Sequence, residues 1–330
     1  MNLKTFLRKT VRIVLPLGLG CILLWYLYQG QDLSEMVKVI KTGVRYDIIL
    51  YSLLFGLGAN VARGYRWGLL IDSLGKKVRR INTVLAVLGN YAINMALPRV
   101  GEIWRCGIIA KYEKVPFSKL LGTLFIDRVM DTLVVGILTL CVAVFNISFF
   151  NRYFTDHPEF LTGFKSLFTS VWIYAALAFA VVCLWLMFAK LSHLAFVQKI
   201  KLMLLNIWEG VKSLWKMKHK TRFFLQTLMI WAGYFLYFYI TFYAFDFTRD
   251  LGPRIGLIAF TMSSVAVAVP IQGGIGVWHF AVISTLICFG VSESDAATFA
   301  LVVYMVQSVL WTVSTGLVSI LALPVINRKE

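Results

Sequence analysis

Long apolar stretches separated by short polar connectors run along almost the whole chain. About 20 apolar residues cross the roughly 30 Å hydrocarbon core of a bilayer as a helix. Stretches of this kind, each predicted to be a membrane-spanning helix, cover residues 11–28, 48–71, 120–150, 167–189, 223–247 and 297–326. The pattern therefore predicts an all-α polytopic membrane protein with a single membrane domain over residues 1–330.

Two other apolar stretches, residues 81–112 and 255–289, are interrupted by proline, glycine and polar residues. The first break covers residues 98–102 and the second break residues 270–276. In lipid, irregular backbone is tolerated only where it is buried in protein or lines a watered cavity, and matching breaks in two halves point to a carrier's binding site. Arms of about fifteen residues rise only about 22 Å as helix. We therefore predict two re-entrant hairpins; the alternative is two ordinary pairs of short spans that Pro and Gly merely kink.

Composition and charge agree with a membrane location. Apolar residues make up 59% of the chain and charged residues 15%, and the net charge is +17, whereas a soluble domain carries about 25% charged residues. The mean hydropathy is +0.76. The basic residues gather in a few connectors, so the positive-inside rule and anionic headgroups explain the excess, and no nucleic-acid partner is predicted. The N-terminus and residues 76–80, 99–119 and 199–222 are predicted to be cytoplasmic, and residues 148–166, 246–254 and 290–296 external.

These predicted sides give the two hairpins opposite orientations. Residues 81–112 enter and leave from the cytoplasm, and residues 255–289 from the external side. The chain is then an inverted repeat of helix, re-entrant hairpin and helix over residues 48–150 and 223–326, which is a common construction for alternating-access carriers. Both termini are predicted to lie on the cytoplasmic side of the membrane.

Two segments lie outside the repeat. The N-terminal span, residues 11–28, is interpreted as an anchor and not as a signal peptide, because no small-residue cleavage site follows its apolar run. Residues 167–222 link the halves and end in a basic segment, residues 190–222, with apolar residues at helical spacing. This segment predicts a central amphipathic helix lying in the cytoplasmic interface; a helix that binds a partner protein is the alternative.

Charged residues at and beyond the first break are the first candidates for a site. Arg99, Glu102 and Arg105 follow Pro98 and flank Gly101, and Glu102 is near enough along a helix to pair with either arginine. Charges in or near a membrane are costly and are therefore read as functional by default. The alternative is that they anchor the chain at the cytoplasmic headgroups.

A charged triplet, Asp127, Arg128 and Asp131, lies inside the apolar span 120–150. The two aspartates share one helix face, and Arg128 is three residues before Asp131. The triplet carries a net negative charge, so it needs a further cation. The arginines that could supply it are Arg63, Arg66, Arg99 and Arg105. A buried ionic network that only fixes helix register is the alternative interpretation.

The second break is neutral and rich in glycine. After Pro270 come Gln272, Gly273, Gly274 and Gly276, which predict a loop of free amides, and the helix that follows would bind an anion such as phosphate at its start. His279 could donate to that anion or relay a proton, or it could be structural. A polar lining could be completed by Asn60, Arg63, Arg66, Asn90, Asn94 and Gln307.

The sequence contains no motif for metal binding, redox chemistry or nucleotide binding. The five cysteines are scattered singly, and no Cys and His spacing suggests zinc, a redox pair or a disulfide framework. No metal and no cofactor is therefore predicted. There is no Walker A sequence, so ATP is not expected to be the direct energy source.

Three ordered motifs together resemble one family. They are Asn94-x-x-x-Pro98-Arg99-x-Gly101-Glu102-x-x-Arg105, then Asp127-Arg128-x-x-Asp131, then Pro270-x-x-Gly273-Gly274-Ile275-Gly276. They resemble the signature of the lysylphosphatidylglycerol synthase transmembrane region, also called the flippase-like domain family, over residues 10–322. The resemblance implies a polytopic protein of the bacterial cytoplasmic (inner) membrane that is connected with moving a lipid between leaflets. In bifunctional members this region flips an aminoacylated phospholipid made by a separate soluble domain.

The chain departs from those members in two ways. Only four residues follow the last span, so no aminoacyl-transferase domain, and no lysyl transfer, is expected. His279 stands where many relatives carry an acidic residue, which bears on proton coupling and on headgroup preference.

The resulting hypothesis is a lipid translocase for a phosphate-containing lipid. The phosphate would be held by Arg99, Arg105 and the amides of residues 273–276, while Glu102, Asp127 and Asp131 balance the arginines or contact a headgroup amine. The partners are then membrane lipids and a separately encoded lipid-modifying enzyme. One alternative is an intramembrane transferase using a polyprenyl-phosphate donor, with Glu102 or Asp127 as base and His279 as acid. A scaffold for such an enzyme is the other.

Overall fold

The computed structural model describes residues 18–97, 99–147, 217–269 and 271–328, together with a few isolated residues between 175 and 208. Several predictions lie outside the described residues: the span 167–189, the amphipathic helix 190–222 apart from its last residues, the connector 148–166, and the prolines Pro98 and Pro270.

The described residues are helical, and they hold no strand beyond an isolated antiparallel bridge between Val44 and Phe245. The first part of the chain forms an N-terminal helix Gly18–Tyr28, α2 Leu33–Lys38, α3 Tyr46–Asp72, α4 Arg80–Ala96, α5 Val100–Glu113 and α6 Phe117–Phe145. The later part forms α11 Lys220–Tyr239, a 3₁₀ turn η2 Ile240–Ala244, α12 Pro253–Ala266, a 3₁₀ turn η3 Gln272–Gly274, α13 Val277–Cys288, α14 Glu293–Val303, a π-helical turn η4 Tyr304–Trp311 and α15 Thr312–Ile326.

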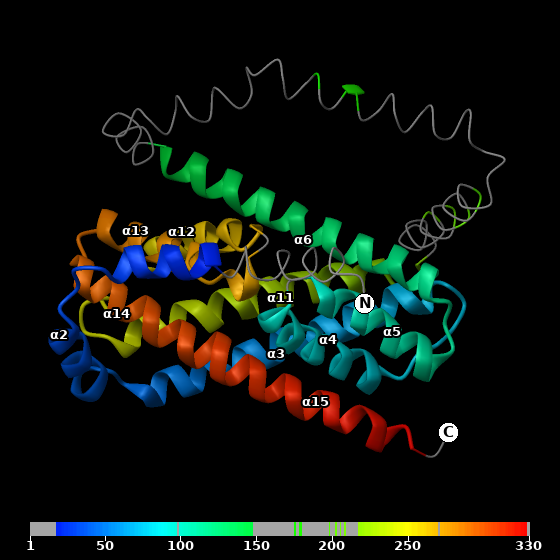
Figure 1. Ribbon diagram of the computed structural model, residues 1–330. Helices are drawn as coiled ribbons and strands as arrows, with labels where there is room; N and C mark the ends of the chain where they lie inside the picture. The colour runs from blue at the N-terminus through cyan, green and yellow to red at the C-terminus, as the bar shows by residue number, and fades with distance from the viewer. Residues whose placement is uncertain are drawn as a thin grey trace.

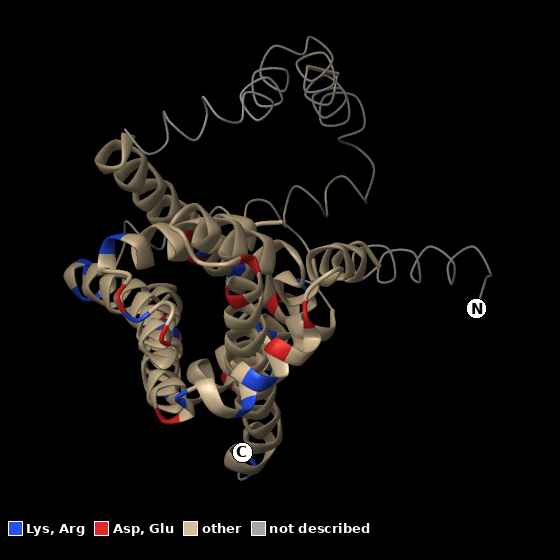
Figure 2. Ribbon diagram, turned by 90° about the vertical axis from the view of Figure 1, so that its left-hand side faces the viewer, with Lys and Arg blue, Asp and Glu red and all other residues tan. Residues whose placement is uncertain are grey.

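Four of these segments are long and apolar enough to cross a membrane: Tyr46–Asp72, Phe117–Phe145, Lys220–Ala244 and Glu293–Ile326. The predicted all-α polytopic membrane protein is confirmed. On α6, exposed apolar residues recur along one face at Leu133, Ile137, Leu140 and Val144. Such a surface suits hydrocarbon and not water. In a view along the bundle, Lys, Arg, Asp and Glu occupy only a few places on the helices (Figure 2).

The long helices run lengthwise through the bundle, and the short ones form two pairs at opposite ends (Figure 1). The pair α4 and α5 (cyan) lies at the end where α15 finishes, and the pair α12 and α13 (yellow and orange) lies at the end where α14 begins. Helices of 17 and 14 residues in the first pair, and of 14 and 12 in the second, rise between about 18 and 26 Å. Re-entry of these pairs into a bilayer, and the inverted repeat, stay predictions.

The two breaks meet inside the bundle. Helix α4 packs against η3 of the second break, and a Cβ atom added at Gly273 would lie 2.7 Å from the Met95 sulfur at the end of α4. The meeting point therefore joins the two halves of the chain.

Small residues let the central helices approach closely. A Cβ at Gly64 on α3 would lie 2.6 Å from the Val84 Cα atom on α4. Two turns further along α4, a Cβ at Gly316 of α15 would collide with the Ala92 Cβ atom. Close backbone packing through Gly and Ala is the usual way for helices to associate in lipid. Helix α4 thus packs closely against both α3 and α15, and this packing positions the first break.

Candidate functional site

A buried ionic cluster lies where α3, α5 and α6 come together. Its centre is Asp127 on α6, which is fully buried. The Arg66 Nη2 atom lies 2.6 Å from Asp127 Oδ1, the Arg105 Nη2 atom 3.0 Å from Asp127 Oδ2, and the Arg63 Nη1 atom 3.8 Å from the same Oδ2. Three of the four arginines predicted as partners for the triplet therefore surround one carboxylate.

Asp131, one helical turn further along α6, extends the cluster toward its accessible edge. It accepts from Arg66 Nη2 at 2.7 Å and also pairs with Arg63. Arg128 Nη1 lies 3.8 Å from Asp131, as the three-residue spacing predicts. The arginines of α3 therefore bridge the two aspartates, which share one face of α6.

The predicted partner of Glu102 is wrong. Glu102 pairs with neither Arg99 nor Arg105 but with Arg128 on α6, with 3.0 Å between Glu102 Oε1 and Arg128 Nε. The first turn of α5 lies against α6, so a contact between helices replaces the contact along one helix. Arg99 does not join the cluster: its side chain is exposed, and its φ of 64° places it in the left-handed region as the residue before α5.

Charges in the cluster do not balance. Among the described residues, the four arginines Arg63, Arg66, Arg105 and Arg128 face three carboxylates. The guanidinium of Arg105 is fully buried, stacks 4.6 Å from the Trp67 ring, and leaves Nε and Nη1 without a hydrogen-bond acceptor in the described part of the chain. A buried cation without full compensation is costly, so the cluster has a surplus of positive charge that an anion would neutralise.

Tyrosine hydroxyls extend the cluster along α11 and α4. Tyr234 on α11 donates to Asn60 Oδ1 at 2.7 Å, accepts from Arg63 Nε at 3.2 Å and lies 3.1 Å from the Tyr91 hydroxyl. Sequence reasoning selected Asn60 and Arg63 but missed both tyrosines. Tyrosine is common in apolar spans, so no local signal marks these two. Only the position of Tyr91 beside Asn90 and Asn94 on one helix hinted at a polar face.

The first break is a tight connection between α4 and α5. Asn94 Oδ1 accepts from the Gly101 amide at 2.9 Å, and Asn94 Nδ2 donates to Asn90 Oδ1 at 3.4 Å. A Cβ at Gly101 would collide with the Asn90 carbonyl. The close approach of α4 and α5 explains why residue 101 is a glycine. Asn94, which was predicted to be part of a polar lining, accepts a hydrogen bond from a backbone amide in the first turn of α5.

The second break turns through glycines with positive φ. Gly273, Gly274 and Gly276 have φ values of 58°, 76° and 82°. The predicted loop of free amides is partly wrong, because the Gly274 amide donates to Ile271 and the Ile275 amide to Gln272 within the loop. Gly276 faces the N-terminal helix, since a Cβ there would lie 2.9 Å from the Gly20 carbonyl.

His279 and Gln272 lie in the protein interior beside this break. The His279 ring is 4.5 Å from the Tyr304 ring and 6.1 Å from the Tyr28 ring of the N-terminal helix, and its Nδ1 atom has no hydrogen-bond partner among the described residues. Gln272 is 1% exposed. Tyr304 ties the break to the last span by donating to the Gly273 carbonyl at 3.0 Å. No ion pair links His279 to the charged cluster within the described part.

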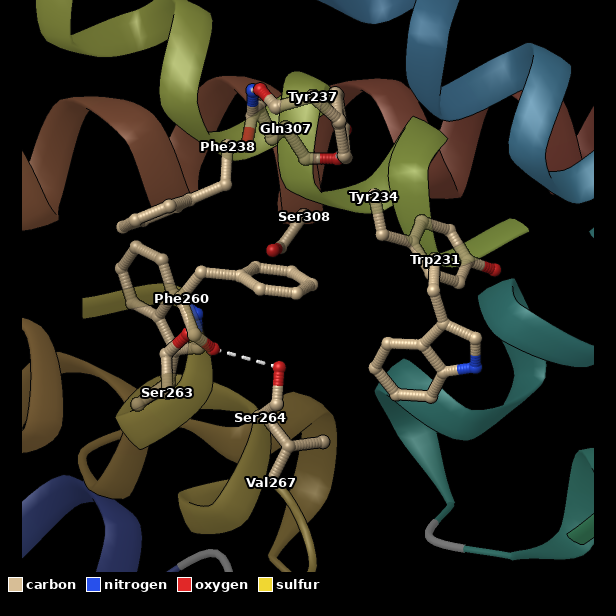
Figure 3. Close-up of a pocket in the computed structure, with 11 residues that line it drawn as sticks. Trp231, Tyr234, Tyr237, Phe238, Phe260, Ser263, Ser264, Val267, Gln307 and Ser308 are labelled. Atoms are coloured by element: carbon tan, nitrogen blue, oxygen red, sulfur yellow. Dashed lines mark hydrogen bonds between the residues drawn. The ribbon is translucent and has the colours of Figure 1, made fainter. Parts of the chain in front are cut away.

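An aromatic cavity of about 290 Å³ lies between α11, α12 and η4 (Figure 3). Trp231, Tyr234 and Phe260 line it, and the hydroxyl of Tyr234 also contacts Arg63. Polar groups in the lining are bonded to the protein: Gln307 Nε2 donates to Ser52 Oγ at 2.9 Å, and Ser264 donates to the Phe260 carbonyl at 2.7 Å. The cavity is therefore mainly apolar and shares the Tyr234 side chain with the charged cluster.

No group of three or more His, Cys, Asp or Glu side chains among the described residues is placed to hold a metal ion. The side chains that come together are arginines, carboxylates, asparagines and tyrosines. The arginines, asparagines and tyrosines of such a set can bind an anion, and its carboxylates can bind a cationic headgroup, by charge and hydrogen bonds.

The model of the family described as "Lysylphosphatidylglycerol synthase TM region" matches residues 13–314. A UPF0104 membrane protein of Methanocaldococcus jannaschii is 30% identical over 139 residues, which are 41% of this chain and 37% of that protein. The chain therefore spans a little over a third of the length of that curated relative. No solved structure matches the chain.

Proposed function

The chain belongs to the lysylphosphatidylglycerol synthase transmembrane-region family, and on this basis we propose that it is a translocase that moves a phosphate-containing lipid between the leaflets of the membrane. The family description names the synthase of a membrane lipid, and this supports a lipid-related role for a multi-pass membrane protein of the family. The finer proposal, movement between leaflets, rests on the chemistry of the buried cluster and on the two breaks that meet at mid-bundle.

The observation that carries the proposal is the surplus of positive charge in the ionic cluster. Ionisable residues inside a membrane protein face its interior and mark substrate or ion pathways. Among the residues that the structure describes, four arginines against three carboxylates leave one positive charge to be neutralised. A lipid phosphate is the anion that a membrane supplies in quantity, and arginine binds phosphate through several hydrogen bonds at once.

Access to the cluster is from its partly exposed edge. The Arg128 side chain is 34% exposed and that of Glu102 is 24% exposed, while Arg99 is exposed at the first break. We assign the first contact with the phosphate to Arg99 and Arg128. Arg105 is held by Asp127 and by the Trp67 ring, so its role is to position the carboxylate unless the helices rearrange.

Leaflet exchange in liposomes tests the proposal. The purified protein is reconstituted with labelled phospholipids and, in a separate arm, with a labelled polyprenyl phosphate. Arg99→Ala and Arg128→Gln are each expected to slow protein-dependent exchange about tenfold or more, because a hydrogen bond to a charged group contributes about 1.5–3 kcal/mol. Arg45→Ala is the control, since Arg45 is an exposed surface residue with a weak pair to Asp47 at 3.7 Å.

The outcomes separate the proposal from its rivals. A translocase is supported if the wild type exchanges lipid, Arg99→Ala and Arg128→Gln each slow this exchange, and Arg45→Ala leaves it unchanged. Correctly folded protein that exchanges no lipid overturns it. Formation of a new lipid product by the purified protein would instead indicate an intramembrane transferase, and dispensable site arginines would indicate a scaffold.

A further inference from the structure

A second cavity lies at the end of the bundle away from the ionic cluster. It has a volume of about 630 Å³ and lies between the end of α6, α11 and the start of α12. Val142, Phe145, Phe235 and Leu257 give it apolar walls. The volume falls within the range of about 300–1,000 Å³ that is usual for small-molecule sites.

One charged side chain lines this cavity. Arg254, in the first turn of α12, donates from Nε to Asn146 Oδ1 at 2.5 Å, and no carboxylate pairs with it in the described part of the chain. The neighbouring exposed arginine at the same end, Arg249, does have such a partner, with 3.5 Å between its Nη1 atom and Asp246. Arg254 therefore brings a cationic hydrogen-bond donor without a carboxylate partner to the edge of an apolar cavity.

The cavity and the cluster are separated along the same helix. Asp127 lies in the first half of α6, and Asn146 directly follows its last residue. The helix between them rises about 28 Å. This distance is close to the thickness of the hydrocarbon core, which is about 30 Å. The two regions thus lie at the depths of opposite leaflets if α6 spans the bilayer.

We propose that the second cavity is a lipid-binding subsite that takes the phosphate of an anionic lipid headgroup at Arg254 and part of an acyl chain along α6, α11 and α12. The assignment rests on the proposed translocase and gives it a site at the end opposite the ionic cluster. A guanidinium beside apolar walls matches an amphiphile with a negative head, whereas a free anion would use only the guanidinium.

Side-chain contacts connect this subsite with the ionic cluster. Phe235 lines the second cavity, and its ring lies 5.8 Å from that of Phe260, which lines the aromatic cavity. Tyr234 lines the aromatic cavity in turn and bonds Arg63 of the cluster. The Phe235 and Phe260 rings therefore stand between two cavities that follow one face of α11 and α12.

Cys141 provides a native reporter, because it lines the second cavity and is an exposed free thiol. The full-length protein in detergent is treated with N-ethylmaleimide, and the modification rate of each cysteine is followed by peptide mass spectrometry. Phosphatidylglycerol is expected to slow the labelling of Cys141 but not of the exposed Cys288 on α13. Diacylglycerol with the same chains, and inorganic phosphate, serve as separate probes of the chain and of the charge.

Variants locate the headgroup. In Arg254→Gln, half-protection of Cys141 is expected to need about tenfold more phosphatidylglycerol, because a charge-assisted hydrogen bond is lost. Protection by diacylglycerol, weaker in the wild type, is expected to be the same in this variant. Arg249→Gln is the matched control and should behave as the wild type, and Leu257→Trp, which fills the cavity, should weaken protection by both lipids.

Equal protection of Cys141 by phosphatidylglycerol in the wild type and in Arg254→Gln overturns the subsite. Protection by inorganic phosphate alone would also overturn it, because the ligand would then be a free anion and not a lipid. The translocase fails separately: lipids that protect Cys141 in an Arg254-dependent way but never exchange between leaflets would leave the subsite standing and remove the carrier.

Discussion

Replacing Asp127 with asparagine is expected to lower the free energy of unfolding by about 3–5 kcal/mol, or to prevent accumulation of the folded protein. Removing one partner of a buried ion pair leaves an uncompensated buried charge, and the cost of that charge is of this size. Asp127 is fully buried and is contacted by Arg63, Arg66 and Arg105. The variant leaves Arg63 and Arg66 with Asp131, and it removes the one carboxylate that Arg105 contacts among the described residues.

Chemical unfolding of the detergent-solubilised protein, followed by circular dichroism, measures this loss. Asp246→Asn is the control, since the Asp246 side chain is 87% exposed, and surface substitutions usually stay within about 0.5 kcal/mol. The double variant Asp127→Asn with Arg105→Gln removes both charges of one pair and is expected to recover at least about 1 kcal/mol through their coupling. An unfolding midpoint of Asp127→Asn equal to that of the wild type would show that the cluster is not a structural network.

Gly273→Ala is expected to reduce leaflet exchange about tenfold or more and to destabilise the protein by about 2–3 kcal/mol. The φ of 58° at this position costs a residue with a side chain about 1–2 kcal/mol. The added Cβ would also lie 2.7 Å from both the Met95 sulfur and the Tyr304 hydroxyl. Met95 belongs to α4 and Tyr304 donates to the Gly273 carbonyl, so the contact between the two breaks must open.

Gly290→Ala is the control that separates the effect of backbone strain from the effect of a steric clash of the added Cβ atom. Gly290 has a φ of 87°, but nothing lies within 4 Å of a Cβ added there. The free energy of unfolding of the Gly290→Ala variant is expected to fall by about 1 kcal/mol, and the variant is expected to exchange lipid as fast as the wild type. Adding Met95→Ala to Gly273→Ala makes room for the new methyl group and should restore part of the exchange. Identical exchange rates for Gly273→Ala and Gly290→Ala would show that the meeting of the breaks plays no part in transport.

Part of the ionic cluster could be predicted from the sequence, because a charge in a medium of low dielectric constant must be paired with an opposite charge. Two aspartates on one face of an apolar helix need cations as partners, and only a few arginines lie inside or close to the apolar spans. Arg63, Arg66 and Arg105 were among the arginines considered, and all three contact Asp127. Arg99 was also considered, but its side chain is exposed, and the residue stands in a left-handed turn before α5 begins.

Other contacts could not be predicted, since they depend on how helices lie against one another. Glu102 had two arginines three residues away along the chain, yet the packing of α5 on α6 brings Arg128 to it. Tyr91 and Tyr234 complete the polar network but carry no charge and have no distinctive spacing. The aromatic cavity and the cavity at Arg254 combine residues from helices that are distant in the chain.

The sequence by itself determined that this protein is an all-α polytopic membrane protein, because hydrophobic length and the costs of buried charge and of unpaired backbone in lipid act locally along the chain. Tertiary structure alone decided which arginine neutralises which carboxylate, that the two breaks meet through Met95 and Gly273, and that Arg254 reaches an apolar cavity. Ion pairs and cavities form across distances of a few ångströms between distant segments, so they follow from the close approach of helices and not from the order of residues.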